Sequence, residues 1–127
     1  MTLFSRTIHA LQSKLYSRAH TTRRIISAKG FIDRHYAEPL DLEEIARQAC
    51  FSKYHFIRLF QRHYGRTPYQ YLIEVRVAKA KELIRGGMTV RGACFAVGYD
   101  SLTSFSARFR QMTGSPPSLV RQKSNSG

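Results

Sequence analysis

The 127-residue sequence has little negative charge, because eight Asp and Glu residues stand against 21 Lys and Arg residues, for a formal net charge of +13. Such an excess favours a polyanion or an anionic membrane surface as the partner. From residue 45 onward there are fourteen basic residues and three acidic ones, whereas five of the eight acids lie between Asp33 and Glu44. We therefore expect one side of the molecule to be more basic than the other.

The sequence has only two cysteines, and neither Cys50 nor Cys94 belongs to a CxxC pair or lies at metal-ligand spacing from a histidine. Both follow apolar helical patterns, so we interpret them as small buried thiols in a reducing compartment. No apolar run approaches the ~20 residues that span a bilayer. Residues 1–20 also lack the apolar centre of a signal peptide. We therefore expect no membrane partner and a cytoplasmic location.

Motifs for catalysis and cofactor binding are absent as well. The five histidines show neither HExxH nor another metal-binding spacing. The sequence also lacks a glycine-rich phosphate loop and a Ser–Gly nucleophile elbow. We predict that the protein is not an enzyme and that it binds no metal and no cofactor.

Residues 41–62 have the pattern of two short helices around a tight corner. Asp41 and Ser52 can cap these helices, because their side-chain oxygens can accept hydrogen bonds from the N–H groups of an opening turn. An apolar inner face is expected on the second helix from Phe56, Leu59 and Phe60. Its outer face is basic and rich in hydrogen-bonding groups: Lys53, Tyr54, Ile57, Arg58, Gln61 and Arg62. Such a face is what reading a DNA major groove requires.

The same pattern returns at residues 89–113, at an offset of 48 that becomes 49 past the corner. Thr89 corresponds to the cap Asp41. The aromatic core positions also correspond, since Phe51, Phe56 and Phe60 match Tyr99, Phe105 and Phe109. We expect the second corner to be one residue longer than the first.

Between the two copies, Thr67 and Pro68 start a helix that runs to Gly86-Gly87. About eighteen residues at ~1.5 Å each give a length of roughly 26 Å. A continuous helix of that length can place two reading helices about one DNA turn, near 34 Å, apart on one face of a duplex. Because the two reading helices differ, the predicted DNA site is asymmetric.

The first twenty residues contain Phe4, Ile8, Leu11 and Leu15, spaced four, three and four apart, which predicts an amphipathic helix. It could lie on the domain or fray in solution, contact a second copy or another partner, or touch a membrane surface. A second helix is expected to start at Thr21-Thr22 and to run to about Ala37. Residues 122–127 form a polar tail that we expect to be disordered.

Several of these segments have a characteristic sequence, among them Pro39-Leu40-Asp41-Leu42-Glu43-Glu44-Ile45-Ala46, Gly65-Arg66-Thr67-Pro68 and Val97-Gly98-Tyr99-Asp100-Ser101. With the segment 51–60, Arg76, Phe105, Phe109 and Gly114, they resemble the DNA-binding domain of the AraC/XylS family of transcription regulators. The resemblance covers about residues 25–121. The chain resembles the stand-alone MarA/SoxS/Rob type, or an isolated domain of a longer protein.

The resemblance implies an all-α, homeodomain-like fold with two helix-turn-helix subdomains joined by a central linker helix. The expected domain spans residues 21–121 after an extension at 1–20. Within it we place the first helix-turn-helix at about 41–64, the linker helix at about 68–85 and the second at about 89–113. The implied function is transcription activation in the bacterial cytoplasm and nucleoid, on double-stranded DNA and through contact with RNA polymerase. We expect a monomer on DNA, with residues 1–20 as a candidate dimer contact.

In the first reading helix, resemblance and helix geometry agree on Tyr54, Ile57 and Arg58 as the residues that face base edges. Arg58 is the candidate for a bidentate contact to guanine. Ile57 departs from the polar residue of MarA-like relatives, and it could touch a thymine methyl group or contribute little. Lys53, Arg62 and Arg66 suit contacts to phosphates.

The second reading helix has less hydrogen-bonding chemistry. The residues at the family's groove-facing positions are Leu102, Thr103, Ser104, Ser106 and Ala107. Ala107 replaces an arginine that is common near that position, and Arg108 and Arg110 are candidates for phosphate contacts. We expect the first copy to supply most of the direct base readout and the second to add affinity or to read DNA shape.

The main alternative is a basic helical module that binds nucleoid DNA or RNA without sequence preference, because the net charge alone would support it. A regulator differs by preferring its own site over random duplex by several powers of ten.

Overall fold

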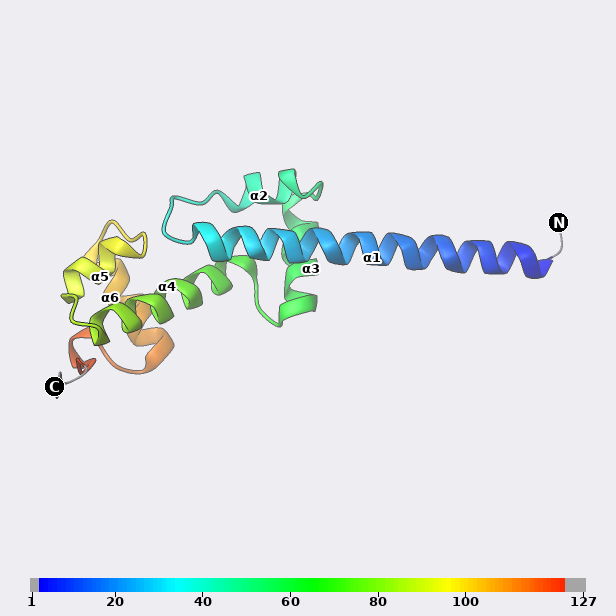
Figure 1. Ribbon diagram of the computed structural model, residues 1–127. Helices are drawn as coiled ribbons and strands as arrows, with labels where there is room; N and C mark the ends of the chain where they lie inside the picture. Colours follow the sequence, from blue (N-terminus) through cyan, green and yellow to red (C-terminus); the bar gives the residue numbers. More distant parts are fainter. Residues whose placement is uncertain (1–2, 123–127) are drawn as a thin grey trace.

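The computed structural model describes residues 3–122, and helices account for its regular structure (Figure 1). No strand occurs in residues 3–122, so the predicted all-α fold is confirmed. The elements in chain order are α1 (Leu3–His35), α2 (Leu42–Gln48), α3 (Lys53–Tyr64), α4 (Pro68–Arg85), α5 (Val90–Ala96), α6 (Leu102–Thr113) and the 3-10 helix η1 (Pro117–Leu119).

The predicted helix caps are confirmed. The side chain of Asp41 accepts a hydrogen bond of 3.0 Å from the Glu43 N–H, and that of Ser52 accepts one of 3.2 Å from the His55 N–H. Thr89 caps α5 in the same way as Asp41 caps α2. At the start of α4, Thr67 and Gln70 exchange side-chain and backbone hydrogen bonds in a capping box. Local sequence therefore fixes where these helices begin.

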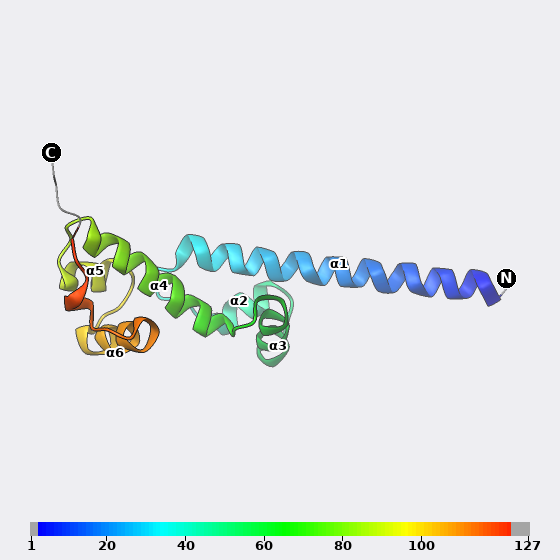
Figure 2. The same ribbon diagram turned by 90° about the horizontal axis from the view of Figure 1, so that it is seen from below.

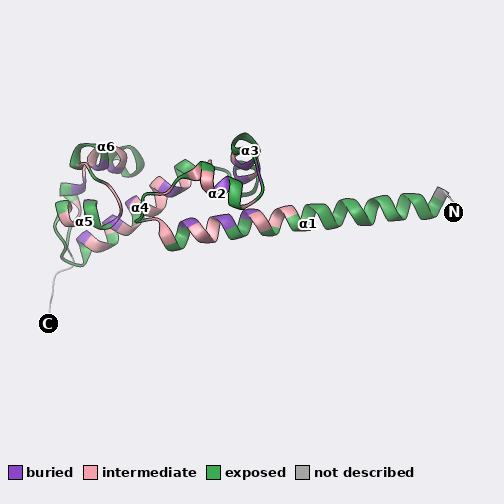
Figure 3. Ribbon diagram, turned by 90° about the horizontal axis from the view of Figure 1, so that it is seen from above, coloured by how far each residue is buried: buried purple, intermediate pink, exposed green. Residues whose placement is uncertain are grey.

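α1 is a single uninterrupted helix of 33 residues, so the expected new helix start at Thr21-Thr22 is wrong. The reason is that residues 3–29 contain no Gly or Pro that could break the helix. Residues 4–20 are exposed on every side, and this half of α1 projects beyond the rest of the molecule (Figure 3). The tail expected to be disordered spans residues 122–127. Gln122 is described and belongs to no helix, and residues 123–127 lie outside the described part of the chain.

The first lobe consists of the second half of α1 with α2, α3 and the start of α4. Its buried side chains form one hydrophobic cluster: Ile25, Ala28, Ile32, Ile45, Ala46, Phe51, Phe56, Phe60 and Leu72. Removing these apolar surfaces from water is what holds the four helices together. Phe56 and Phe60, which are 1% and 0% exposed, anchor α3 on this core.

The second lobe is built on the other end of α4, with α5, α6 and η1. Its cluster repeats the first one in character: Val77, Ala80, Ile84, Ala93, Cys94, Val97, Phe105 and Phe109. Tyr36, just after α1, packs against both clusters. α4 is continuous over 18 residues and contributes to both cores, so it is the predicted linker helix.

The two corners differ in length as expected, with four residues between α2 and α3 and five between α5 and α6. Both contain a left-handed backbone position, which is Cys50 (φ 63°) in the first corner and Gly98 (φ 103°) in the second. The expectation that both cysteines are buried is half wrong, because Cys94 is buried and Cys50 is exposed. In the first corner the chain turns at Cys50 itself, whose N–H donates to the Arg47 carbonyl (2.9 Å) while Phe51 enters the core.

Candidate nucleic-acid interface

α3 and α6 lie on the same side of α1. This arrangement is visible from below in Figure 2 and from above in Figure 3. Each is the second helix of its pair and is 12 residues long. α4 connects the two pairs, so the spacing of α3 and α6 is set by a helix that belongs to both cores.

The outward face of α3 is centred on Arg58. Tyr54 and Arg58 are four residues apart and therefore share one face of the helix. Both are exposed, Tyr54 to 74%. Gln61 and Arg62, three and four residues after Arg58, continue this face and are exposed as well. The structure thus brings the predicted residues Tyr54 and Arg58 together on the side opposite the core.

Ile57 lies at the edge of this face. Its side chain is half-buried and lines a cavity of about 460 Å³ together with Leu40, Leu42 and Tyr69. Helix geometry explains the position, since Ile57 follows Phe56 directly and turns only about 100° away from it. Gln61 occupies the exposed position next to Arg58 and was not among the predicted base readers. Its signal in the sequence was the spacing of three residues from Arg58.

α6 presents the smaller side chains that were predicted. Leu102, Thr103, Ser104 and Ala107 are exposed, whereas Ser106 is half-buried. At the offset of 49, Thr103 corresponds to Tyr54 and Ala107 to Arg58. By the same offset the exposed pair Arg110 and Gln111 corresponds to Gln61 and Arg62. Gln111 is not among the residues predicted from the sequence, although its correspondence to Arg62 places it on the same face.

The predicted phosphate ligands fall into two groups. Lys53, Arg62 and Arg110 are exposed and make no ion pair with a carboxylate in residues 3–122. Arg66 instead forms an ion pair with Glu74 of α4. Arg108 is half-buried, donates to the Gln111 side chain (3.2 Å) and lies 6.0 Å from the ring centroid of Tyr69. The first group is therefore the freer to reach a phosphate.

A polar cluster ties α1 to α4 behind this surface. The Tyr71 hydroxyl donates to Asp33, and the Lys29 Nζ atom lies 3.1 Å from the same carboxylate. Burial raises the pKa of Tyr71, with the hydrogen bond to Asp33 as the next cause. The pKa of Lys29 is also raised, by its hydrogen bonds to Tyr71 and Asp33. These contacts hold the neutral phenol and the charged ammonium group in place.

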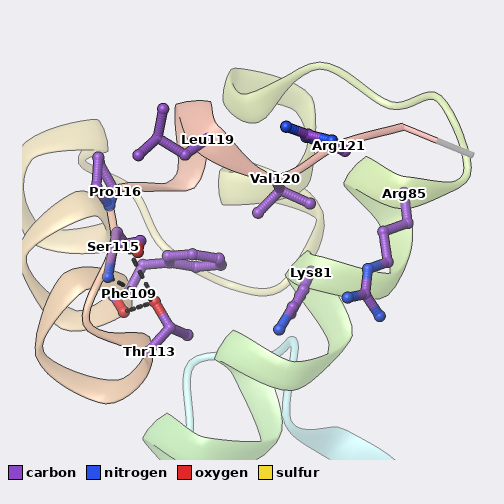
Figure 4. A pocket seen from close by; sticks show the side chains of 9 residues that line it. All are labelled: Lys81, Arg85, Phe109, Thr113, Ser115, Pro116, Leu119, Val120 and Arg121. Atoms are coloured by element: carbon purple, nitrogen blue, oxygen red, sulfur yellow. Dashed lines mark hydrogen bonds between the residues drawn. The ribbon is translucent and has the colours of Figure 1, made fainter.

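No group of three or more His, Cys, Asp and Glu side chains in residues 3–122 could hold a metal ion. A cavity of about 340 Å³ beside α6 is lined by Lys81 and Arg85 of α4 and by Arg121, which follows η1 (Figure 4). The Thr113 hydroxyl in this cavity donates a hydrogen bond of 2.8 Å to the Phe109 carbonyl oxygen, within the last turn of α6.

The fold contains two pairs of helices, and the second helix of each pair is exposed on the same side of the molecule. This arrangement, with basic side chains on that side, defines a helix-turn-helix DNA-binding protein. A family model described as "Helix-turn-helix domain" matches residues 45–123. The chain belongs to the AraC/XylS family of transcription regulators, whose DNA-binding domain it contains. No helix in residues 3–122 combines the length and apolar character needed to cross a bilayer.

Three similar proteins illustrate this membership. The transcriptional activator RhaS of Escherichia fergusonii is 31% identical over 123 residues, which are 94% of this chain and 44% of RhaS. The C-terminal domain of AraT, a response regulator from Geobacillus stearothermophilus, is 25% identical with a TM-score of 0.76, over 82% of this chain and 90% of that domain. The DNA-binding domain of AdpA in complex with a target DNA is 28% identical with a TM-score of 0.70, over 74% of this chain and 86% of that one.

The chain spans between a quarter and a half of the length of four curated relatives that it matches. These relatives are mainly named as transcription regulators, and one of them, AdaA of Bacillus subtilis, is named as a bifunctional activator and DNA repair enzyme.

Proposed function

We propose that this chain is a sequence-specific regulator that reads two adjacent major-groove segments of one duplex, one with α3 and one with α6. The observation that carries the proposal is the common orientation of α3 and α6, which stand on one side of the molecule on the two ends of α4 (Figure 2). Two recognition helices held in this way can meet the same face of a duplex without a second subunit.

In the proposed complex α3 supplies most of the base readout. Arg58 donates to the N7 and O6 atoms of a guanine, Tyr54 lies beside it, and Ile57 contacts a thymine methyl group from the edge of the face. Gln61 is added to this set because it is exposed next to Arg58. α6 contributes weaker contacts from Leu102, Thr103, Ser104, Ser106 and Ala107.

Five basic residues are proposed as phosphate ligands: Lys53, Arg62, Arg66, Arg108 and Arg110. They would position the domain without reading sequence. Arg66 and Arg108 already have partners in Glu74 and Gln111, so we expect them to contribute less than the others.

We further propose that the chain activates transcription from the bacterial cytoplasm, through RNA polymerase, and that it binds DNA as a monomer. The name of RhaS as an activator supports the first part. The presence of both recognition helices in one chain supports the second. A dimer contact through residues 1–20 would use the stripe of Phe4, Ile8, Leu11 and Leu15, which is exposed. Sedimentation of the protein with and without its duplex measures the stoichiometry.

The proposal is tested by selecting bound sites from random duplex and then measuring competition between the enriched site and random DNA. We expect a preference of at least about 10³ at physiological salt, and an enriched site with two unequal parts about one helical turn apart. Equal binding of both duplexes would support the non-specific module instead. Transcription from a promoter that carries the enriched site, with and without the protein, then separates activation from repression.

A further inference from the structure

A groove of about 700 Å³ lies between α1 and α3, where the projecting half of α1 leaves the first lobe. α1 lines it with Arg18 and with the hydroxyls of Ser17 and Thr21, and α3 lines it with His55 and Arg62. None of the residues that line it is a carboxylate. Neither arginine forms an ion pair with an Asp or Glu in the described range 3–122. The groove is therefore rich in donors and positive charge.

His63 of α3 forms a contact between the two walls of the groove. Its Nδ1 atom lies 3.0 Å from the Leu59 carbonyl oxygen, which can only accept, so Nδ1 carries the proton. In the neutral ring the Nε2 atom is then an acceptor, and the Thr22 hydroxyl, 3.4 Å away, donates to it. This contact joins α1 to α3 directly, so the two arginines are placed by packed helices.

The groove adjoins the reading face of α3. His55 precedes Arg58 by three residues and Arg62 follows it by four, so both are its neighbours on the helix surface. When a recognition helix enters the major groove, the sugar–phosphate strands pass along its flanks, and neighbouring elements contact them. Arg18 brings a second guanidinium group to the α1 side of α3.

We propose that the groove between α1 and α3 binds a backbone phosphate of the DNA that flanks the segment read by α3. Arg18 and Arg62 are the charged ligands and the hydroxyls of α1 are additional donors, which is the chemistry that proteins use for phosphate groups. The inference rests on the proposed function, since it needs α3 to lie in a major groove. It gives the N-terminal half of α1 a part in DNA affinity.

Lys14 extends the site along α1. It precedes Arg18 by four residues, so it lies on the same face, and it is exposed. The sequence has no Asp or Glu before Asp33, so no acidic side chain opposes a phosphate strand along this half of the helix. Lys14 is therefore expected to meet the next phosphate outward from the groove.

The test is the salt dependence of duplex binding by Arg18→Ala, with Arg23→Ala as the matched control. Arg23 is exposed and five residues further along, which turns it about 140° around the helix from Arg18. In Arg18→Ala the slope of log affinity against log salt concentration should be less steep by about one. The ratio of wild-type affinity to variant affinity should therefore shrink about threefold between about 50 and 200 mM salt. The loss should be equal on the enriched and on random duplex. Arg23→Ala should bind as the wild type does.

A duplex with one neutral methylphosphonate linkage at successive flanking positions identifies the phosphate. At one position, beyond the segment read by α3, the wild type should lose the affinity that Arg18→Ala has already lost, and the variant should lose nothing further. Arg18→Lys should restore most of the salt slope, and far-ultraviolet circular dichroism should show that all variants keep their helices.

Three outcomes would overturn the proposal: an unchanged salt slope in Arg18→Ala, equal losses for both proteins at every neutral linkage, or equal effects of Arg18→Ala and Arg23→Ala. Competition by inorganic phosphate at matched ionic strength is the remaining experiment. If the groove binds only free anion, phosphate should compete with the duplex, but no single neutral linkage should lower the affinity of the wild type. If the wild type binds the enriched and random duplexes equally, the proposed sequence specificity fails, while the salt slope of Arg18→Ala still decides on the groove.

Discussion

The Arg76 Nε atom, in the middle of α4, donates a hydrogen bond of 2.7 Å to the carbonyl oxygen of Tyr36. The Nη2 atom of the same guanidinium group donates to the Glu38 carbonyl oxygen at 2.9 Å, and the central carbon of the group lies 5.4 Å from the ring centroid of Tyr99. The chain that leaves α1 has carbonyl groups without helical partners, and Arg76 satisfies two of them. One side chain thus joins the end of the first lobe, the linker helix and the corner of the second lobe.

Replacing Arg76 should weaken the contacts between these three parts. We expect Arg76→Ala to lower the free energy of unfolding by about 1.5–3 kcal/mol, the usual worth of hydrogen bonds from a charged donor that is partly buried. Urea denaturation followed by circular dichroism measures this value. Arg85→Ala is the control, because Arg85 is an exposed arginine of the same helix and should change stability by less than about 0.5 kcal/mol. A similar loss in both variants would contradict the role of Arg76.

Gly98 should be far less replaceable than Gly114. Both have positive φ angles, of 103° and 82°. A Cβ atom at Gly98 would lie 2.9 Å from the Ala37 carbonyl oxygen, whereas at Gly114 nothing lies within 4 Å. We expect Gly114→Ala to cost about 1 kcal/mol of stability for its backbone strain alone, and Gly98→Ala about 3 kcal/mol or more because the corner must also move. Thermal unfolding of the two variants side by side would refute this account if their midpoints matched.

Arg58→Ala tests base readout. Because a bidentate contact to guanine discriminates by about 1–3 kcal/mol, the variant should lose roughly tenfold or more in affinity for the enriched site and should accept other bases at one position. The residue of α6 that corresponds to Arg58 is already an alanine, Ala107, so the substitution cannot be repeated in the second lobe. Repeating the site selection with the variant measures the effect. Equal losses on the enriched and random duplexes would assign Arg58 to a phosphate instead.

Lys53→Ala should weaken binding to every duplex alike and lower the salt slope by about one. Arg66→Ala is a useful comparison, because the ion pair with Glu74 already occupies its guanidinium group. We expect a smaller change of slope for Arg66→Ala, measured by fluorescence anisotropy over a salt series. A larger effect of Arg66 than of Lys53 would show that the ion pair opens on DNA.

Stability should fall at alkaline pH. Burial raises the pKa of Tyr71 and of Tyr99 above 10.0, and hydrogen bonds to Tyr71 and Asp33 raise that of Lys29 above 10.5. Since these groups hold their protons more tightly in the folded state, the stability that they add is complete below about pH 10 and is lost as the pH rises further. The free energy of unfolding, measured between pH 8 and 11.5, should fall less steeply for Tyr71→Phe. An identical pH profile would rule out the cluster as the cause.

The repeated pattern of caps and core aromatics was enough to predict two helix pairs, their linker and the unequal corners, because these features depend on local sequence. Three features depend on tertiary packing and were missed. Thr21 and Thr22 resemble a helix start, but Thr22 contacts His63 and the helix continues through them. Cys50 has an apolar neighbourhood in sequence, but the corner turns it outward. The spacing places Ile57 on the outer face, but it does not show that the side chain is half-buried and lines a cavity with Leu40 and Leu42.

The continuity of α1 has a mechanical consequence. Ile25 and Ile32 fix the second half of this helix in the first core, and the exposed half is an unbroken extension of the same rod (Figure 1). The phase of the rod is therefore set by the core, and one residue inserted before Thr21 would rotate everything ahead of it by about 100° and advance it by about 1.5 Å. A domain fused at Leu3 would stand at a fixed azimuth to α3. Insertions of one to four residues would place it stepwise around the axis of α1.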